Sequence, residues 1–248
     1  MSGHSKWNNI KRKKEKTDGA KAKVFTKIGR ELAVAVKQGG GPDPNANSRL
    51  RDCIAKAKAA NVPNDNIERI IKKAAGDGDE NKYETIQYEG YGPNGIAVIV
   101  EALTDNRNRT AGDIRHYFDK FGGNLGQSGC VSFLFERKGV ILIEKEGLNE
   151  DKVMEDGLEA GASDFQSDED VFEIDTEPDD FSGVLGDLEK KGYEFVSAEV
   201  EMVPSTTVTL EDPDAAVKMQ RLLDAMEDND DVQNVWHNWD ISDEDEEN

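Results

Sequence analysis

Apolar residues recur at three- and four-residue steps in the first third of the chain, a period that predicts amphipathic helices. Between residues 20 and 38 they fall on one stripe: Val24, Phe25, Ile28, Leu32, Ala35 and Val36. At about 100° per residue, the opposite side carries Lys23, Lys27, Arg30 and Lys37. The run Gly39-Gly40-Gly41-Pro42 ends this helix. We therefore expect a first helix with one apolar face and one cationic face.

Two further helices are predicted by the same period. The second is capped by Asn47 or Ser48 and stops before Val62-Pro63. Its apolar positions are Leu50, Cys53, Ile54 and Ala57. The third begins at Asp65, with Glu68 as its capping-box partner. Three short amphipathic helices can share one core, so residues 20–75 are expected to form a helical bundle.

Strand-like alternation begins after a polar, glycine-rich linker at residues 76–82. Two strands are predicted over residues 85–91 and 96–103. The helix that follows is expected to start at Thr110, with Asp113 as its capping-box partner.

The next segment, residues 131–146, predicts a hairpin that turns at Lys138-Gly139. From Val140 onward the expected order is β-α-β-β-α-β, the split βαβ arrangement. After Pro204, a strand, a helix and another strand can complete a second α/β unit with the elements of residues 85–121.

These patterns predict the α+β fold class with three domains, an N-terminal helical bundle followed by two α/β (ferredoxin-like) domains. The expected parts are a basic arm (1–19), the helical domain (20–75), a discontinuous α/β domain (83–130 plus 205–240), an inserted α/β domain (131–204) and an acidic tail (241–248).

Charge is sharply segregated along the chain, whose net charge is −21. Residues 1–75 hold 18 lysines and arginines against 7 acidic residues, a net charge of +11. The remaining residues hold 13 basic and 45 acidic residues, a net charge of −32. Such asymmetry indicates two surfaces with different partners.

Several function classes are disfavoured by what the sequence lacks. No apolar run approaches the roughly 20 residues that span a bilayer, and the N-terminus lacks the apolar stretch of a signal peptide. We therefore expect a cytoplasmic protein with no membrane contact. Cys53 and Cys130 are far apart and the three histidines lack ligand spacing, so no metal is expected. No nucleophile, phosphate-loop or dinucleotide motif is present, which predicts no cofactor, no catalytic residue and no enzyme.

The strongest chemical feature is a cationic set at the N-terminus. Its members are Lys6, Lys11, Arg12, Lys13, Lys14, Lys16, Lys21, Lys23, Lys27 and Arg30, with Trp7 and Phe25 among them. Cations at this density neutralise several phosphates and give binding that weakens steeply with salt. Trp7 can stack on an unpaired base, a contact more typical of RNA or single strands than of duplex DNA. The alternatives are a solvated basic face and a tryptophan that packs on the bundle.

A second candidate site is the segment TDNRNRT, residues 104–110, which lies between a predicted strand and the N-terminus of a predicted helix. Arg107 and Arg109, with a helix dipole behind them, suit a phosphate or another anion. Equally, the residues of this segment can cap the helix and pair with nearby carboxylates. Both interpretations stay open at the level of the sequence.

The opening GHSKWNNIKRKK and the following AKVFTKIGRELAVAVKQGGGPDPNANSRLR resemble the YebC family. The resemblance continues through NVPNDNIERIIKKAAG, YEGYGPNGIAVIVEALTDNRNRT, DIRHYFDKFGGNLG and GCVSFLFERKG, and covers nearly the whole chain except the acidic tail. It implies a helical domain and two α/β domains, the middle one completed by the C-terminus. It also implies nucleic-acid binding and control of gene expression. Bacterial members are described as probable transcriptional regulators and have been linked to translation, and the family includes the mitochondrial translational activator of cytochrome c oxidase subunit I.

Together these features favour a nucleic-acid-binding regulator that docks its basic domain on ribosomal RNA and assists translation. RNA is favoured because the sequence shows no evident helix-turn-helix dimer pattern, and a basic arm suits irregular RNA. The acidic domains are expected to meet basic proteins, such as those of the ribosome. One alternative is a DNA-binding transcriptional regulator. The other is a ligand-binding or enzymatic protein with a site between the α/β domains, near Arg107 and Arg109.

Overall fold

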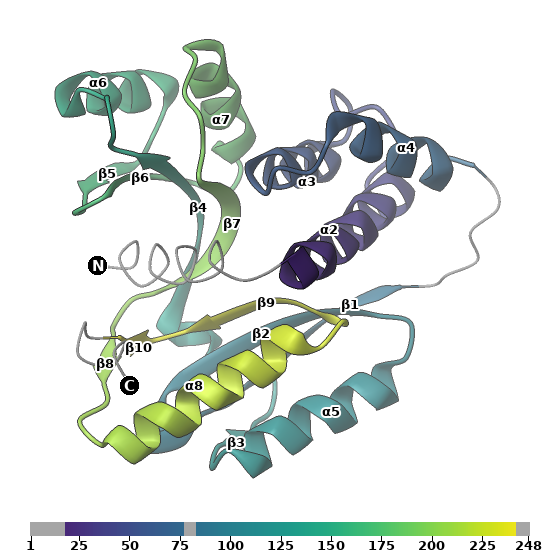
Figure 1. Cartoon of the computed structure of the whole chain (residues 1–248), viewed down its shortest axis with the longest axis vertical. Helices are drawn as coiled ribbons and strands as arrows, with labels where there is room; N and C mark the ends of the chain where they lie inside the picture. Colours follow the sequence, from purple (N-terminus) through teal and green to yellow (C-terminus); the bar gives the residue numbers. More distant parts are fainter. Residues whose placement is uncertain (1–17, 77–82, 242–248) are drawn as a thin grey trace. The chain divides into compact units, whose positions relative to one another are not determined.

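The structure is a computed structural model that describes residues 18–76 and 83–241 (Figure 1). The described residues form two compact units. The first unit comprises the described residues up to 76 together with residues 137–201. The second unit comprises residues 83–136 together with residues 202–241. The mixed helices and antiparallel sheets confirm the predicted α+β class. The finer division into three domains stays a prediction.

The first unit begins with three helices, α2 (Asp18–Gln38), α3 (Ser48–Ala59) and α4 (Asn64–Ala74). Their apolar stripes meet in one core of Ile28, Leu32, Ala35, Val36, Leu50, Ala57, Val62, Ile67 and Ala74. Asn47 caps α3: its Oδ1 accepts from Leu50 N at 3.0 Å, and its Nδ2 donates to Ala35 O at 2.8 Å. This buried amide therefore joins the end of α2 to the start of α3, and it decides between the two predicted caps.

The predicted capping box of α4 is wrong. The helix begins at Asn64, one residue earlier than expected, with Pro63 at the N-cap and no side-chain cap hydrogen bond. Asp65 therefore lies inside the first turn, where its carboxylate cannot take the position of a cap. The Pro63 carbonyl instead accepts from Asn66 N and Ile67 N, which satisfies part of the first turn through the backbone.

The predicted β-α-β-β-α-β order is confirmed in the segment that follows residue 134. Its elements are β4 (Phe135–Glu144), α6 (Glu150–Ala160), β5 (Asp164–Ser167), β6 (Val171–Thr176), α7 (Phe181–Lys190) and β7 (Ser197–Pro204). The sheet order is β5-β6-β4-β7, with β6 antiparallel to both β4 and β5. The two split βαβ units therefore interleave as in a ferredoxin-like sheet. Helices α6 and α7 close its apolar face around Ile141, Phe172 and Phe181.

The hairpin predicted at Lys138-Gly139 is wrong, because β4 runs without interruption from Phe135 to Glu144. Gly139 sits inside the strand, opposite Thr176 of β6. A Cβ on Gly139 would clash with Thr176 Oγ1 and lie 2.6 Å from Cδ2 of Phe181. The glycine therefore marks a close approach of α7 to the sheet, which a sequence pattern cannot distinguish from a turn.

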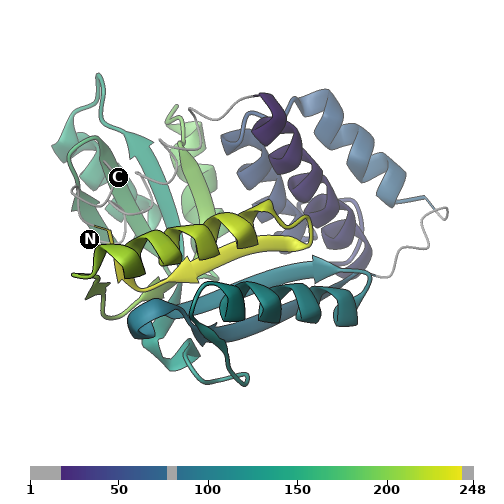
Figure 2. The same cartoon turned by 60° about the horizontal axis from the view of Figure 1, so that its bottom comes forward.

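The second unit contains β1 (Glu84–Tyr91), η1 (Pro93–Gly95), β2 (Ala97–Thr104), α5 (Arg107–Lys120), β3 (Asn124–Leu125) and η2 (Ser132–Leu134). The returning chain adds β8 (Val208–Thr209), α8 (Pro213–Asp228), β9 (Val232–His237) and β10 (Trp239–Asp240). The main sheet has the order β3-β1-β2-β9 and is antiparallel at each junction. Helices α5 and α8 lie side by side on one face (Figure 2). Strand β2 is buried on both faces, by Ile114, Phe118 and Met219 on one side and by Val131 and Phe135 on the other.

Helix α5 begins at Arg107, three residues before the predicted start at Thr110. Asn106 is the N-cap, and its Oδ1 accepts from Arg109 N at 3.1 Å. Thr110 is fully buried and turns its hydroxyl inward to Thr104, at 2.8 Å. Asp113 accepts from the side chain of Asn229, so it is not the capping-box partner that the sequence suggested.

A buried carboxylate fixes the loop between β3 and β4. Glu89 of β1 is only 4% exposed. Its Oε1 accepts from Gly129 N at 2.9 Å, and its Oε2 accepts from Val131 N and Ser132 N at 3.0 and 2.9 Å. Burial alone would raise the pKa of Glu89, but these three backbone amides and Gln87 hold it below the usual value of 4.5.

Gly139→Ala is expected to lower the free energy of unfolding by about 1–3 kcal/mol, because the added methyl group overpacks the contact with Thr176 and Phe181. Gly186→Ala in α7 is the matched control, since nothing lies within 4 Å of a Cβ at that position. Alanine also has the higher helix propensity, so this control should stay level or gain up to about 1 kcal/mol. Urea unfolding followed by circular dichroism compares them, and equal stabilities would contradict the packing role of Gly139.

Glu89→Gln is expected to destabilise the protein by about 1–3 kcal/mol at neutral pH, because the carboxylate's hydrogen bonds are weakened. The folded-state pKa of Glu89 is lowered, so its stabilisation is present above pH 4.5 and is lost as the pH falls through the lower folded value. The stability gap between wild type and variant should therefore close on acidification below pH 4.5. Denaturant unfolding against pH measures this gap, with the exposed Glu211→Gln as control. A gap that is independent of pH would contradict the assignment.

Candidate nucleic-acid interface

The predicted cationic set is only partly within the described residues. Lys6, Trp7, Lys11, Arg12, Lys13, Lys14 and Lys16 lie outside them. Lys21 falls on the backbone of α2, and the described side chains of the set are Lys23, Lys27 and Arg30, all on α2. The role of the whole set in binding stays a prediction.

Helix α2 separates its apolar and cationic positions largely as the sequence predicted, but Val24, the first residue of the predicted apolar stripe, is 39% exposed. Ile28, Leu32 and Ala35 are at most 3% exposed and face the bundle core. Phe25 packs partly buried against the same core, which makes it a structural residue of the bundle. Lys23 is exposed, while Lys27 and Arg30 are partly buried. The stems of these two side chains thus cover the bundle, as long cationic side chains commonly do.

The cations of α3 have a different role, because they pair with carboxylates of the same unit. Lys56 Nζ lies 3.2 Å from Glu31 Oε1 and 3.0 Å from Glu199 Oε2. Burial would lower the pKa of Lys56, but Glu199 and Glu31 together raise it above its ordinary value. Lys58 Nζ lies 2.9 Å from Glu189 Oε1 on α7. These two lysines therefore fasten α3 to β7 and α7.

A hydrogen bond from a hydroxyl to a carboxylate completes this junction. The hydroxyl of Ser182 on α7 donates to the Asp52 carboxylate on α3. Burial raises the pKa of Asp52, and this hydrogen bond opposes the rise. The side chains of α3 that face α7 and β7 are therefore occupied by contacts that stabilise the first unit.

Helix α4 carries cations that the sequence interpretation did not include in the site. Arg69, Lys72 and Lys73 are exposed in its last two turns. The run ERIIKK carries these cations in the sequence, but its cations are fewer than those of the N-terminal set. Helix α4 packs against α2, and a Cβ on Gly29 would lie 3.3 Å from Ile70 Cδ1. The cations of both helices thus lie on one bundle.

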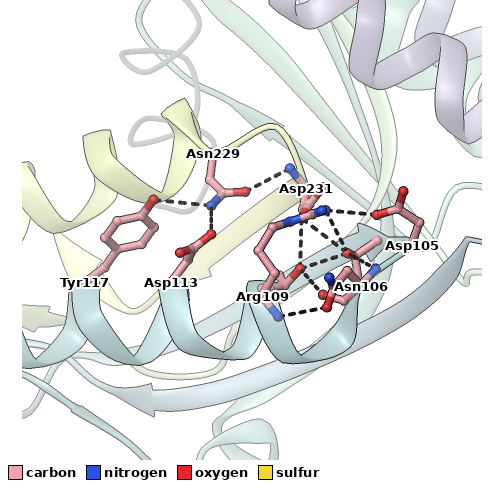
Figure 3. Close-up of polar contacts among 9 residues, drawn as sticks. Asp105, Asn106, Arg109, Asp113, Tyr117, Asn229 and Asp231 are labelled. Carbon is pink, nitrogen blue, oxygen red and sulfur yellow. Dashed lines mark hydrogen bonds and ion pairs between the residues drawn. The ribbon is translucent and has the colours of Figure 1, made fainter.

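The second candidate site, at Arg107 and Arg109, is occupied by intramolecular ion pairs, of which those of Arg109 are drawn in Figure 3. Arg107 Nη2 lies 2.8 Å from Glu84 Oε2. Arg109 Nη2 lies 2.7 Å from Asp231 Oδ2 and 3.0 Å from Asp105 Oδ1. These are the contacts of the capping and ion-pair interpretation. Anion binding at the two arginines stays a prediction.

Asp231 is the centre of this network and is buried to 6% exposure. Its Oδ2 also accepts from the hydroxyls of Thr110, at 2.8 Å, and Thr104, at 3.2 Å. Burial would raise the pKa of Asp231, yet Arg109 and Thr110 hold it below its ordinary value. The network ties the N-terminus of α5 to the start of β9, two segments far apart in the sequence.

Asn229 extends the same network along α5 (Figure 3). Its Nδ2 donates to Asp113 Oδ2 at 3.3 Å and to the Tyr117 hydroxyl at 3.2 Å, and its Oδ1 accepts from Asp231 N at 2.9 Å. Each of the residues labelled there makes at least one of these contacts within this protein. The arrangement stabilises the junction of α5 and α8 with β9.

The described part of the chain shows neither a candidate metal site nor a candidate membrane-spanning helix. Over residues 18–76 and 83–241, no group of three His, Cys, Asp or Glu side chains has the geometry to hold a metal ion. No helix among these residues is long and apolar enough to cross a membrane. Cys53 and Cys130 are both free thiols.

The comparison with known proteins covers both units. Residues 5–77 match the N-terminal domain of TACO1/YebC proteins, and residues 83–239 match their second and third domain. A probable transcriptional regulatory protein of Acetivibrio thermocellus is 65% identical over 240 residues, 96% of this chain and 99% of the relative. One with the same description from Ruminiclostridium cellulolyticum is 60% identical over 248 residues, 100% of both chains.

A solved structure agrees with these matches. The crystal structure of a conserved hypothetical protein from Aquifex aeolicus has a TM-score of 0.81 and 46% sequence identity, and the match covers 92% of this chain and 93% of that one. The predicted resemblance is thereby confirmed, and the chain belongs to the TACO1/YebC family.

Proposed function

We propose that this protein is a non-enzymatic, cytoplasmic regulator of gene expression that binds ribosomal RNA through its basic N-terminal part and assists translation. The observation that carries the proposal is the segregation of charge, +11 in residues 1–75 against −32 in the remainder. Since phosphate contacts dominate nucleic-acid affinity, only the first part of the chain suits a polyanion. The names of the relatives, probable transcriptional regulatory proteins, support a role in gene expression.

The helical bundle suits this role because its apolar and cationic residues are separated. The core side chains of α2 are at most 4% exposed, so the cations of that helix are left at or near the surface. The arm that precedes it adds Lys11, Arg12, Lys13 and Lys14 in one run. A chain with a basic run next to a folded basic module favours irregular RNA, whose loops and single strands admit such a segment.

DNA is the alternative that a specific observation favours, because the relatives are named for transcription. A duplex presents phosphate on all sides, and a body with a net charge of −32 would be repelled wherever it approached one. An RNA backbone carries the same phosphate charge, so this repulsion limits contact to the N-terminal part in either case. The preference for RNA rests on the basic run beside the folded basic module, which suits loops and single strands. The same acidic body is suited to basic protein surfaces, and we propose ribosomal proteins as its partners.

Neutralising the arm is expected to weaken RNA binding and to flatten its salt dependence. The variant carries Lys11→Gln, Arg12→Gln, Lys13→Gln and Lys14→Gln. If each cation contacts one phosphate, the slope of log K against log salt falls by about 3. The matched control removes four exposed cations of the second unit: Arg115→Gln, Lys120→Gln, Lys218→Gln and Arg221→Gln. Fluorescence anisotropy with a labelled RNA hairpin bearing single-stranded flanks measures both slopes, and equal slopes would remove the arm from the site.

Ultraviolet crosslinking in living cells identifies the nucleic acid itself. We expect recovered RNA to concentrate at one locus of ribosomal RNA and the signal to fall in the arm variant. Recovery of promoter DNA with little RNA would replace the translation role with the transcriptional one. An even spread over all cellular RNA would contradict a defined ribosomal site.

A further inference from the structure

The cations of the helical bundle fall into two groups according to what they contact. Lys56 and Lys58 of α3 are held by Glu31, Glu199 and Glu189. Arg69, Lys72 and Lys73 of α4 form no ion pair with any carboxylate in the described part of the chain, and Arg69 donates one hydrogen bond, to Asn66 Oδ1 at 3.0 Å. The first group serves the fold, whereas the second has its charge directed to solvent.

The three α4 cations share one side of their helix. At about 100° per residue they fall within an arc of about 100°. Ile67 and Ala74, which are 4% and 5% exposed, lie on the opposite side and enter the bundle core. The cationic arc therefore faces away from the core, and the side chains can be changed without disturbing it.

The α4 cations adjoin the predicted binding helix α2. The two helices touch where Gly29 meets Ile70, with only 3.3 Å between a Cβ at Gly29 and Ile70 Cδ1. Arg30 follows Gly29 on α2, and Arg69 precedes Ile70 on α4. The close approach that glycine permits thus brings a cation-bearing segment of each helix to one junction.

We infer that Arg69, Lys72 and Lys73 of α4 are a further phosphate-binding site for RNA, continuous with the cationic face of α2; this inference rests on the proposed function. The site takes the RNA backbone, because exposed lysine and arginine side chains on a helix contact phosphates without reading bases. It fixes the position of the bundle on the RNA while the arm reaches unpaired segments. The affinity of this site is therefore independent of base sequence.

The test compares two full-length variants that lose the same charge. The first carries Arg69→Gln, Lys72→Gln and Lys73→Gln, and the control carries Arg115→Gln, Lys120→Gln and Lys218→Gln, three exposed residues of the second unit. Binding of the labelled RNA hairpin with single-stranded flanks is measured over a range of salt. We expect the slope of log K against log salt to fall by about 2–3 in the α4 variant, and to stay unchanged in the control.

Folding and charge are separated by two further measurements. The thermal midpoint of each variant shows whether the bundle is intact, and Lys72→Gln and Lys73→Gln measured singly replace the triple variant if it melts early. The charge-conserving variant Arg69→Lys, Lys72→Arg, Lys73→Arg should retain the wild-type slope. A slope in the α4 variant equal to that of the control overturns the inference.

The outcome for α4 is distinguishable from the outcome for the proposed function. If the arm variant loses affinity and the α4 variant does not, RNA binding stands and the α4 site is wrong. If neither variant loses affinity, RNA binding through the N-terminal part is itself wrong. Equal losses in the α4 variant and its control indicate a general effect of net charge and also overturn the α4 site.

Discussion

One lysine links α3 to two other segments of the first unit. Lys56 of α3 lies between Glu31 of α2 and Glu199 of β7, at 3.2 and 3.0 Å. Without its charge, the two glutamates would face each other in a partly buried place. Breaking such a pair costs about 3 kcal/mol, the lower end of the range for buried pairs, because 21% of the Lys56 side chain is exposed. The position of α3 against β7 depends on this contact, and the contacts of Lys58 and Asp52 hold the same helix against α7.

The same contact shows that some cations of the bundle serve the fold, whereas others carry their charge at the surface. A lysine placed between two carboxylates cannot also neutralise phosphate without losing its partners. Lys58 and Lys56 therefore add to the basic composition of residues 1–75 while contributing to the fold. The count of 18 lysines and arginines in residues 1–75 therefore overstates the number of cations that an RNA can reach. What matters for binding is which face of each helix its cations occupy.

In the second unit, buried carboxylates are stabilised by local donors. Glu89 accepts three backbone amides of one loop, and Asp231 accepts two threonine hydroxyls and the Arg109 guanidinium. Each holds together segments that are distant in the sequence, and each keeps its charge because hydrogen bonds compensate for burial. Part of the acidic composition is thus structural, and the remainder gives the surface its negative potential.

The sequence by itself determined the helices of the bundle, the α+β class and the β-α-β-β-α-β order, because hydrophobic periodicity is a local property that each element carries in its own residues. It also placed the densest cations near the N-terminus. Only the tertiary structure decided that Gly139 lies inside a strand, since a glycine marks a turn or a close approach equally well and the neighbour that needs the space, Phe181, comes much later in the chain. The tertiary structure likewise distinguishes the ion-paired Lys56 from Lys72, although the two lysines look alike in the sequence. The carboxylates that contact Lys56 are brought to it only by folding. The sequence specifies which residues are charged, but the partner that neutralises each charge depends on distances that only folding sets.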